Sequence, residues 1–217
     1  MVEKFVDHED MLDPAEDETI IADGVSFDNF LKYFGEQHTE WLGGKVISVV
    51  SNNTQHQMIL GFLYKVLSLF LSLRSLGRIL LAGVPMRIAA DLPVREPDLL
   101  IILNEHVARI QATFIDGPAD IVVEIVSPES NDRDRGKKLR EYEAAGVPEY
   151  WLFDPQRTEA VIYHLGENGH YHPLPVDGDG NLRSNVLPGF RLQASLLWRE
   201  ELPDGAELIQ LVQAMVG

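Results

Sequence analysis

A single glutamate interrupts a strongly apolar stretch of this 217-residue chain. Residues 121–126 (IVVEIV) predict a buried strand, because runs of five or six aliphatic residues bounded by glycine and proline are typical of strands. Burying an ionised carboxylate costs several kcal/mol unless it is paired, hydrogen-bonded or metal-bound. Glu124 must therefore lie either at a functional site or on the one exposed face of its strand.

The neighbouring segments favour a functional site. Asp98 opens the apolar run 99–103, residues 132–143 have a charged helical pattern, and a further apolar run, 150–153, ends at Asp154. Pairing of the first two strands could bring Asp98 alongside Glu124. Two carboxylates, a backbone carbonyl and water are suitable ligands for Mg²⁺ or Mn²⁺. Lys138, on the helix, would add a cation, and together these groups are typical of phosphodiester hydrolysis.

The helix predicted after Glu124 has a defined start, face and end. Asn131 can cap it, with Asp134 three residues later in the position of a capping-box acid. Asp134, Lys138 and Tyr142 follow at i, i+4 and i+8 and therefore share one face. Gly146 is expected to end the helix.

Two further polar residues lie in the N-terminal half. Residues 40–49 predict a hairpin that turns at Gly43-Gly44, in which Glu40 is most simply a solvent-facing strand residue. Residues 54–76 predict the longest helix, capped by one of residues 52–54 and ended by Gly77. His56 lies in its first turn, where a histidine is most often at the surface. The residues expected to face the core are Met58, Phe62, Val66, Leu69 and Leu73.

Simpler elements complete the chain. Ser26 can cap a short helix over residues 26–34, and residues 78–88 predict one strand that is broken at 83–85. Residues 187–192 and 206–215 predict a final strand and helix. His164, His170 and His172 lack a compact ligand spacing and are expected to be exposed rather than to bind a metal.

Composition narrows the class of protein. Hydrophobic residues make up 45% of the chain, as in an ordinary globular protein. The chain has no cysteine, so Asp, Glu and His remain as side-chain metal ligands. No apolar run approaches the length of a membrane span, and residues 1–18 lack an export-signal pattern. We therefore expect a cytoplasmic protein without a membrane partner. One domain is expected over residues 25–217, after a weakly ordered acidic arm over 1–24.

Net charge is −16, which argues against non-specific nucleic-acid binding, because that affinity comes from Lys and Arg. Residues 1–24 contain nine acidic residues and one lysine, so the acid is concentrated in the arm. The densest basic cluster lies beside the candidate site, and its members are Arg133, Arg135, Lys137, Lys138 and Arg140. One hypothesis is that the arm covers this cluster by imitating the charge of DNA.

These motifs resemble a known family. The segments that carry the likeness are Pro97-Asp98, residues 123–128, Asp134 with 137–139, residues 142–151 and residues 187–189. Together they are similar to the Uma family of putative restriction endonucleases, in the PD-(D/E)XK nuclease superfamily. The resemblance runs from about Ser26 to Leu197. It implies an α/β fold in which a mixed central β-sheet is flanked by helices, with an N-terminal hairpin and a C-terminal β extension.

The resemblance also implies roles for individual residues. Asp98 and Glu124 would bind the metal with the carbonyl of Ile125, and Lys138 would be the charged catalytic residue. The further catalytic candidates are Glu40 and His56, and the candidate nucleic-acid contacts are Arg133, Arg135, Lys137 and Arg140. The chain departs from the parent pattern at Val126, where a lysine is expected, and at Gly43, where an aspartate is common. The resemblance implies that the lysine has moved to the helix as Lys138.

The leading hypothesis is a Mg²⁺-dependent endonuclease (Mn²⁺ as an alternative ion) that cleaves DNA rather than RNA and acts as a homodimer. An inactive descendant that serves as a binding or assembly module is the main alternative, favoured by the net charge and by Val126. A structural Glu124–Lys138 ion pair in an ordinary α/β domain is the third. A glycosidase ranks last, because no cluster of exposed aromatic residues is expected near the two acids.

Overall fold

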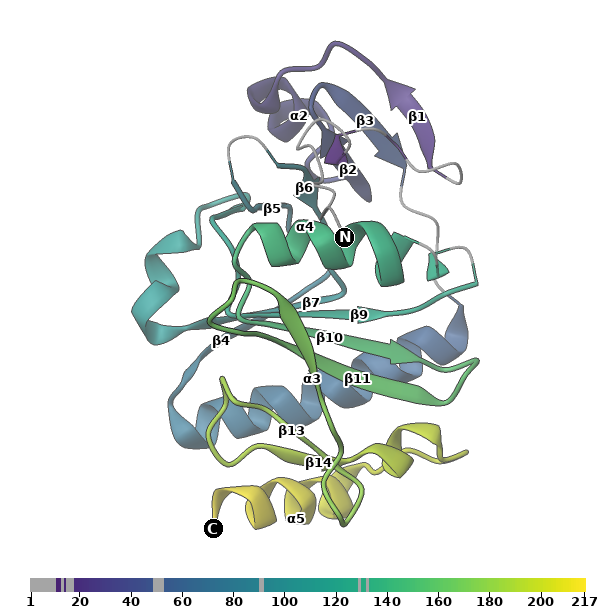
Figure 1. Cartoon of the computed structure of the whole chain (residues 1–217), viewed down its shortest axis with the longest axis vertical. Helices are drawn as coiled ribbons and strands as arrows, with labels where there is room; N and C mark the ends of the chain where they lie inside the picture. Colours follow the sequence, from purple (N-terminus) through teal and green to yellow (C-terminus); the bar gives the residue numbers. More distant parts are fainter. Residues whose placement is uncertain are drawn as a thin grey trace.

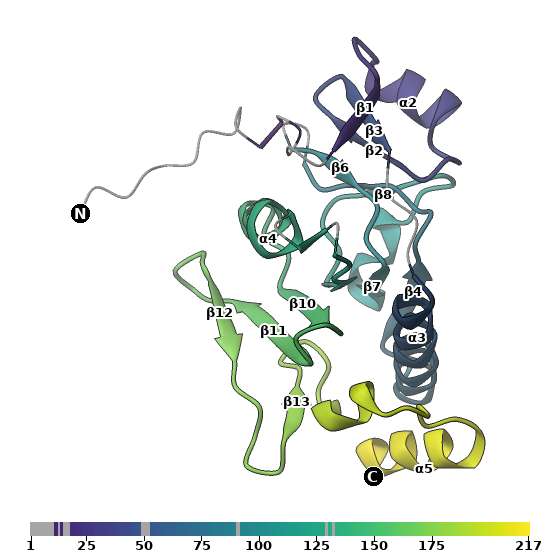
Figure 2. The same cartoon turned by 90° about the vertical axis from the view of Figure 1, so that its right-hand side faces the viewer.

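The computed structural model describes residues 11–12, 14, 18–48, 53–89, 92–128, 130–131 and 133–217. They form two six-stranded sheets and a small hairpin (Figure 1). The N-terminal sheet has the order β1-β3-β2-β6-β5-β8, and the central sheet has the order β12-β11-β10-β9-β7-β4. In both views, α5 and the β13–β14 hairpin lie at the end of the molecule far from β1, β2 and β3 (Figures 1 and 2).

The N-terminal sheet comprises β1 (Thr19–Ala22), β2 (Thr39–Leu42), β3 (Lys45–Ser48), β5 (Met86–Arg87), β6 (Val94–Arg95) and β8 (Ile115–Asp116). The central sheet comprises β4 (Gly77–Leu81), β7 (Leu99–Leu103), β9 (Ile121–Ile125), β10 (Glu149–Asp154), β11 (Glu159–Leu165) and β12 (Tyr171–Leu174), and the hairpin is β13 (Asn181–Arg183) with β14 (Arg191–Gln193). The helices are α2 (Phe27–Tyr33), α3 (Thr54–Arg74), α4 (Lys138–Ala144) and α5 (Gly205–Val216), with short turns η1 (Asn104–Arg109), η2 (Arg133–Lys137) and η3 (Ala194–Trp198).

The central sheet is mixed, as the sequence predicted. β9 and β10 run parallel and are joined through η2 and α4, while the other neighbouring pairs are antiparallel. A parallel pair needs a crossover connection, usually a helix. Here the crossover helix α4 carries Lys138 back over the sheet, towards the strand that carries Glu124.

The two faces of the central sheet have separate cores. Ile101 and Val123 pack on the face that α3 and α5 cover, whereas Leu100 and Val122 pack on the face that α4 covers (Figure 1). Successive strand residues point to opposite faces, so Glu124 shares the α4 face with Val122. That alternation turns the predicted carboxylate towards α4 and the N-terminal sheet.

Helix α3 is capped by the Asn53 side chain, one of the predicted caps. Its predicted inner face is confirmed at Phe62 and Val66, which are buried, but is wrong at its two ends. Met58 is 56% exposed and Leu73 is 51% exposed, whereas Leu63 and Phe70 are fully buried. Apolar residues surround most of this helix, so the pattern alone does not select one face. By length and composition α3 could cross a membrane, yet half of its most apolar stretch is buried, and it contacts β4, β9 and α5 as a core helix.

Three other predicted elements differ from the structure. Helix α3 is capped at its C-terminus by Ser75, which has a left-handed φ of 52°, and not by Gly77. The predicted strand 78–88 is two strands in different sheets, because Gly83 adopts a φ of 97° and passes the chain from one sheet to the other. The predicted strand 187–192 is reduced to β14, whereas the hairpin at Gly43-Gly44, the Ser26 cap and the C-terminal helix are confirmed.

The N-terminal sheet begins inside the segment that was predicted as an acidic arm. Thr19–Ala22 pair with β3, and both Met11 and Glu18 are buried. The remainder of the arm (residues 1–10, 13 and 15–17) lies outside the described residues. The end of the predicted arm is therefore part of the fold.

Candidate active site

Strands β7 and β9 bring the two predicted carboxylates to one site. They pair antiparallel with Leu99 opposite Val123, so continuing this register by one residue brings Asp98 opposite Glu124. Asp98 Oδ2 accepts a hydrogen bond from the Ile125 amide (2.7 Å) and lies 3.0 Å from His56 Nε2. Among the described residues both contacts fall on this one oxygen, so Oδ1 is the Asp98 oxygen left for a cation.

The proline before Asp98 explains how a backbone carbonyl could join the site. Continuing the β7–β9 register by two residues places Pro97 opposite Ile125. Proline has no N–H to donate. The Ile125 carbonyl therefore faces a ladder position that cannot supply a donor, which suits its predicted role as a metal ligand.

Helix α4 supplies the cation. Lys138 Nζ donates to Glu124 Oε1 at 2.7 Å, and the Tyr142 hydroxyl donates to the same oxygen at 2.9 Å. The shared face predicted for Asp134, Lys138 and Tyr142 is confirmed, because all three are buried at this side of the sheet. Val126, where the parent pattern has its lysine, packs in the apolar core beneath α4.

Burial and charge act on both members of this pair. Burial raises the pKa of Glu124 to about 8, helped by the carboxylates of Asp134 and Asp98 and opposed by the Lys138 ammonium. Burial would lower the pKa of Lys138, but the carboxylates of Glu124 and Glu40 outweigh it and raise that pKa. The site therefore holds more negative charge than Lys138 neutralises, and a divalent cation would relieve this excess.

His56 and Glu40 are both inside the protein, and the simpler expectation of surface positions is wrong for each. His56 is buried at the start of α3, where its backbone amide donates to the capping Asn53 side chain. Its ring lies against Asp98. The Glu40 carboxylate accepts hydrogen bonds from Arg95 Nη1 (2.5 Å) and the Glu96 amide (3.1 Å), and it lies 3.6 Å from Lys138 Nζ. Burial would raise the pKa of Glu40, but Lys138 and Arg95 hold it well below its usual range.

Arg95 is a site residue that the sequence analysis missed. Its side chain is fully buried and donates two 2.8 Å hydrogen bonds to Glu141 and a 3.0 Å bond to Glu18, besides its bond to Glu40. Strand β6 has only two residues, too few for a recognisable strand pattern. The one signal in the sequence was the position of this arginine, two residues before Pro97-Asp98.

The predicted nucleic-acid contacts are mostly paired with carboxylates. Arg135 donates to Asp154 and Glu159, each at 2.6 Å, and Lys137 Nζ lies 3.6 Å from Glu18. Arg133 is buried, and Arg140 is exposed. The cluster is therefore not an open basic surface.

A small cavity of about 30 Å³ lies among these groups. This is about the share of volume that one water molecule has in liquid water, so it suits an ion or a water molecule. Its lining residues are His56, Glu96, Asp98, Glu124, Ile125, Ser127, Ser130, Arg133, Asp134 and Lys138. Four of these ten residues carry a carboxylate, and Asp134 Oδ1 is buried with no hydrogen-bond partner in the described part of the chain. This donor set fits a hard divalent cation.

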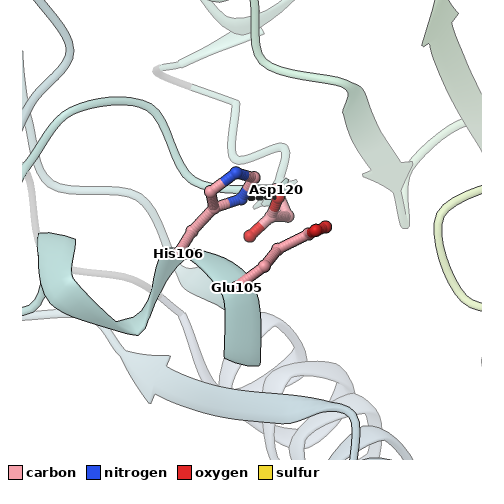
Figure 3. Close-up of side chains that lie close together, drawn as sticks. All are labelled: Glu105, His106 and Asp120. Atoms are coloured by element: carbon pink, nitrogen blue, oxygen red, sulfur yellow. Dashed lines mark hydrogen bonds and ion pairs between the residues drawn. The ribbon is translucent and has the colours of Figure 1, made fainter.

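A second group of potential ligands was not predicted. Glu105, His106 and Asp120 place three ligand atoms within 4.8 Å of one another, between η1 and the start of β9 (Figure 3). Asp120 accepts hydrogen bonds from the Leu103 amide and shares another with His106 Nδ1, each at 2.7 Å. These bonds already anchor η1 to the sheet, which gives the group a structural role.

The three C-terminal histidines have different surroundings. His170 Nδ1 lies 3.2 Å from a Glu143 oxygen, and His172 Nε2 lies 3.1 Å from Asn168 Oδ1. Both rings are exposed, as predicted. His164 is half-buried, so the prediction of exposure is wrong for this residue. Its Nδ1 atom is buried without a hydrogen-bond partner among the described residues and lies 4.0 Å from a Glu149 oxygen.

The sheet order, with an aspartate before β7, a glutamate in β9 and a lysine on the crossover helix, defines a restriction-endonuclease-like fold. The crystal structure of a putative nuclease belonging to DUF820 from Anabaena variabilis ATCC 29413 has this fold, with a TM-score of 0.65, 18% identity and coverage of 80% of this chain and 97% of that chain. The family Uma2, described as "Putative restriction endonuclease", matches residues 27–195. The chain belongs to the Uma2 family. No curated protein matches it.

Proposed function

We propose that this protein is a Mg²⁺-dependent endonuclease that hydrolyses phosphodiester bonds of DNA. The observation that carries the proposal is the cavity shared by Asp98, Glu124 and Lys138. Membership of a nuclease family supports the reaction class. Homodimerisation, which would place one site on each DNA strand, belongs to the same proposal.

The protein's own residues would divide the work. Asp98, Glu124 and the Ile125 carbonyl would hold the ion, which when bound polarises the phosphate and lowers the pKa of the attacking water. His56 fixes the Asp98 carboxylate through the 3.0 Å contact to Oδ2. Lys138 would orient the water or neutralise charge that develops on the phosphate. Glu40 lies 3.6 Å from Lys138 Nζ and the Tyr142 hydroxyl donates to Glu124, so these two residues hold the pair in place.

The alternative, an inactive binding or assembly module, is favoured by the charges of the chain. Arg135 and Lys137 are engaged with carboxylates, and the net charge of −16 adds a repulsive field around the chain. Such a protein would keep the fold without binding a divalent ion at the cavity. Metal titration and a cleavage assay separate the two functions.

Lys138→Met is expected to slow nicking of supercoiled plasmid by about 100- to 1,000-fold, the usual effect of removing one charge-stabilising donor. Binding of Mg²⁺ should be unchanged or tighter, because Glu124 keeps the Tyr142 hydroxyl and loses a competing cation. Lys65→Met is the matched control, since Lys65 pairs with Asp204 at the surface. Equal nicking rates for Lys138→Met and the wild type would contradict the proposed role.

Glu18→Gln is expected to raise DNA affinity. Its carboxylate lies 3.6 Å from Lys137 Nζ and 4.0 Å from Arg133 Nη1, so it neutralises members of the basic cluster that would otherwise attract a phosphate. We expect roughly 3- to 10-fold tighter binding to a short duplex at low salt, and a smaller gain as salt rises. Fluorescence anisotropy without divalent ions measures this, with the exposed Glu36→Gln as control. Unchanged affinity would refute masking by Glu18.

A further inference from the structure

Asp134 lies beside the proposed metal ligands but has no assigned role. Its side chain is 2% exposed, and it lines the cavity with Asp98 and Glu124. The sequence placed it as a capping-box acid. The structure instead has a π-helical turn, Arg133–Lys137, before α4, and this turn places Asp134 one turn before Lys138. Single π-helical turns occur frequently at functional sites.

The Asp134 carboxylate is incompletely satisfied. Within the described ranges its Oδ1 atom is buried without a hydrogen-bond partner, and the nearest cations there are Lys138 Nζ at 3.6 Å and Arg133 Nε at 3.8 Å. Both distances exceed a normal N–H···O hydrogen bond of about 2.7 to 3.2 Å. Arg133 Nε is itself buried without a partner. Two opposite charges thus face each other without bonding, in a place where burial penalises unsatisfied groups.

Each of the three carboxylates has one oxygen that no other group of the described residues bonds. Asp98 is bonded through Oδ2 and Glu124 through Oε1, while Asp134 Oδ1 has no partner among the described residues. Lys138 is shared among Glu124, Glu40 and Asp134, so a single ammonium faces three carboxylates. A divalent cation would supply the charge that this arrangement lacks.

We propose that Asp134 is a third carboxylate ligand of the divalent ion held by Asp98 and Glu124, bound directly or through one ordered water. This inference rests on the proposed function and adds a residue to its metal site. With the Ile125 carbonyl, the protein would supply four of the roughly six oxygens that Mg²⁺ requires. The remaining positions are then available to water and to a phosphate oxygen.

Isothermal titration with Mn²⁺ and with Mg²⁺ tests this ligand. Asp134→Asn preserves the shape of the side chain, and we expect it to weaken ion binding by about 10- to 100-fold or more. Its melting temperature without metal should be equal to or above that of the wild type, because a buried charge is removed. Asp134→Ala provides the same test if the asparagine variant does not fold.

Asp120→Asn is the matched control, because Asp120 is equally buried but belongs to the group with Glu105 and His106. We expect this variant to bind the ion like the wild type. Binding lost in Asp98→Asn but unchanged in Asp134→Asn would overturn the role of Asp134 and leave the proposed nuclease intact. No ion binding by the wild type would overturn both, and loss only in Asp120→Asn would move the ion to the other group.

Discussion

Glu124→Gln is expected to abolish plasmid cleavage and to make the metal-free protein more stable. The substitution removes a metal ligand, so we expect ion affinity to fall by more than the roughly 10- to 100-fold typical of groups outside the coordination sphere. It also removes a buried charge that faces Asp98 and Asp134, while Lys138 keeps its contacts to Glu40 and Asp134. The free energy of unfolding in EDTA should rise by roughly 1 to 3 kcal/mol.

The gain should depend on pH in a defined direction. Folding raises the pKa of Glu124 from 4.5 to about 8, so the folded state binds the proton more tightly than the unfolded state. The wild type therefore loses stability as pH rises between these two values, and the variant does not. The difference in unfolding free energy between Glu124→Gln and the wild type should be largest above pH 8. It should shrink as the pH falls and vanish below about pH 4.5.

Urea unfolding at pH 5, 7 and 9 measures this difference. Glu149→Gln is the contrasting control, because that buried glutamate accepts hydrogen bonds from Trp151, Ser184 and the amides of Asn185 and Val186. Replacing it should lower stability at every pH. If Glu124→Gln also lowers stability at pH 9, Glu124 is a structural ion-pair partner of Lys138 rather than a strained site residue.

Arg95→Met is expected to cost about 3 to 5 kcal/mol of unfolding free energy, the usual cost of removing one partner from a buried ion pair. The guanidinium bonds three buried carboxylates, those of Glu18, Glu40 and Glu141. Glu141 would lose both of its 2.8 Å hydrogen bonds. Cleavage should fall as well, because Glu40 and α4 would no longer be fixed around Lys138.

Chemical denaturation compares Arg95→Met with Arg199→Met, whose arginine forms an exposed pair with Glu207 and should contribute at most about 1 kcal/mol. Adding Glu141→Gln to Arg95→Met should recover part of the loss, because it removes one of the carboxylates left without a partner. Arg95→Lys should not restore full stability, because an ammonium cannot make the bidentate bonds to Glu141. A loss below 1 kcal/mol for Arg95→Met would show that solvent or other cations replace the guanidinium.

Local sequence patterns were sufficient to predict the surroundings of Glu124, two helix caps and one turn. A glutamate within an aliphatic strand has few physical solutions, so its pairing with a cation and its place beside Asp98 could be predicted from residue types and strand order. The Ser26 and Asn53 caps and the Gly43-Gly44 turn were predicted for the same reason. Each depends on neighbours within a few residues.

Long-range packing decided what the patterns left open. Helix α3 is apolar around most of its circumference, and only the sheet and α5 determine that Phe70 is buried while Met58 is exposed. Glu40 and His56 lie in segments that are typical of surfaces, yet both are buried. Their partners are distant in the chain, Arg95 for Glu40 and Asp98 for His56.

The sequence by itself determined the order of the strands and the helix around Glu124, because each of these elements is specified by residues adjacent in the chain. It also predicted that Asp98, Glu124 and Lys138 lie close together, as the structure shows. The tertiary structure decided how their charges are balanced. Arg95 joins carboxylates that are 77, 55 and 46 residues away, and Glu18 turns towards the basic cluster from the N-terminal end. Electrostatic energy depends on distance and burial in space, and neither can be read from spacing along the chain.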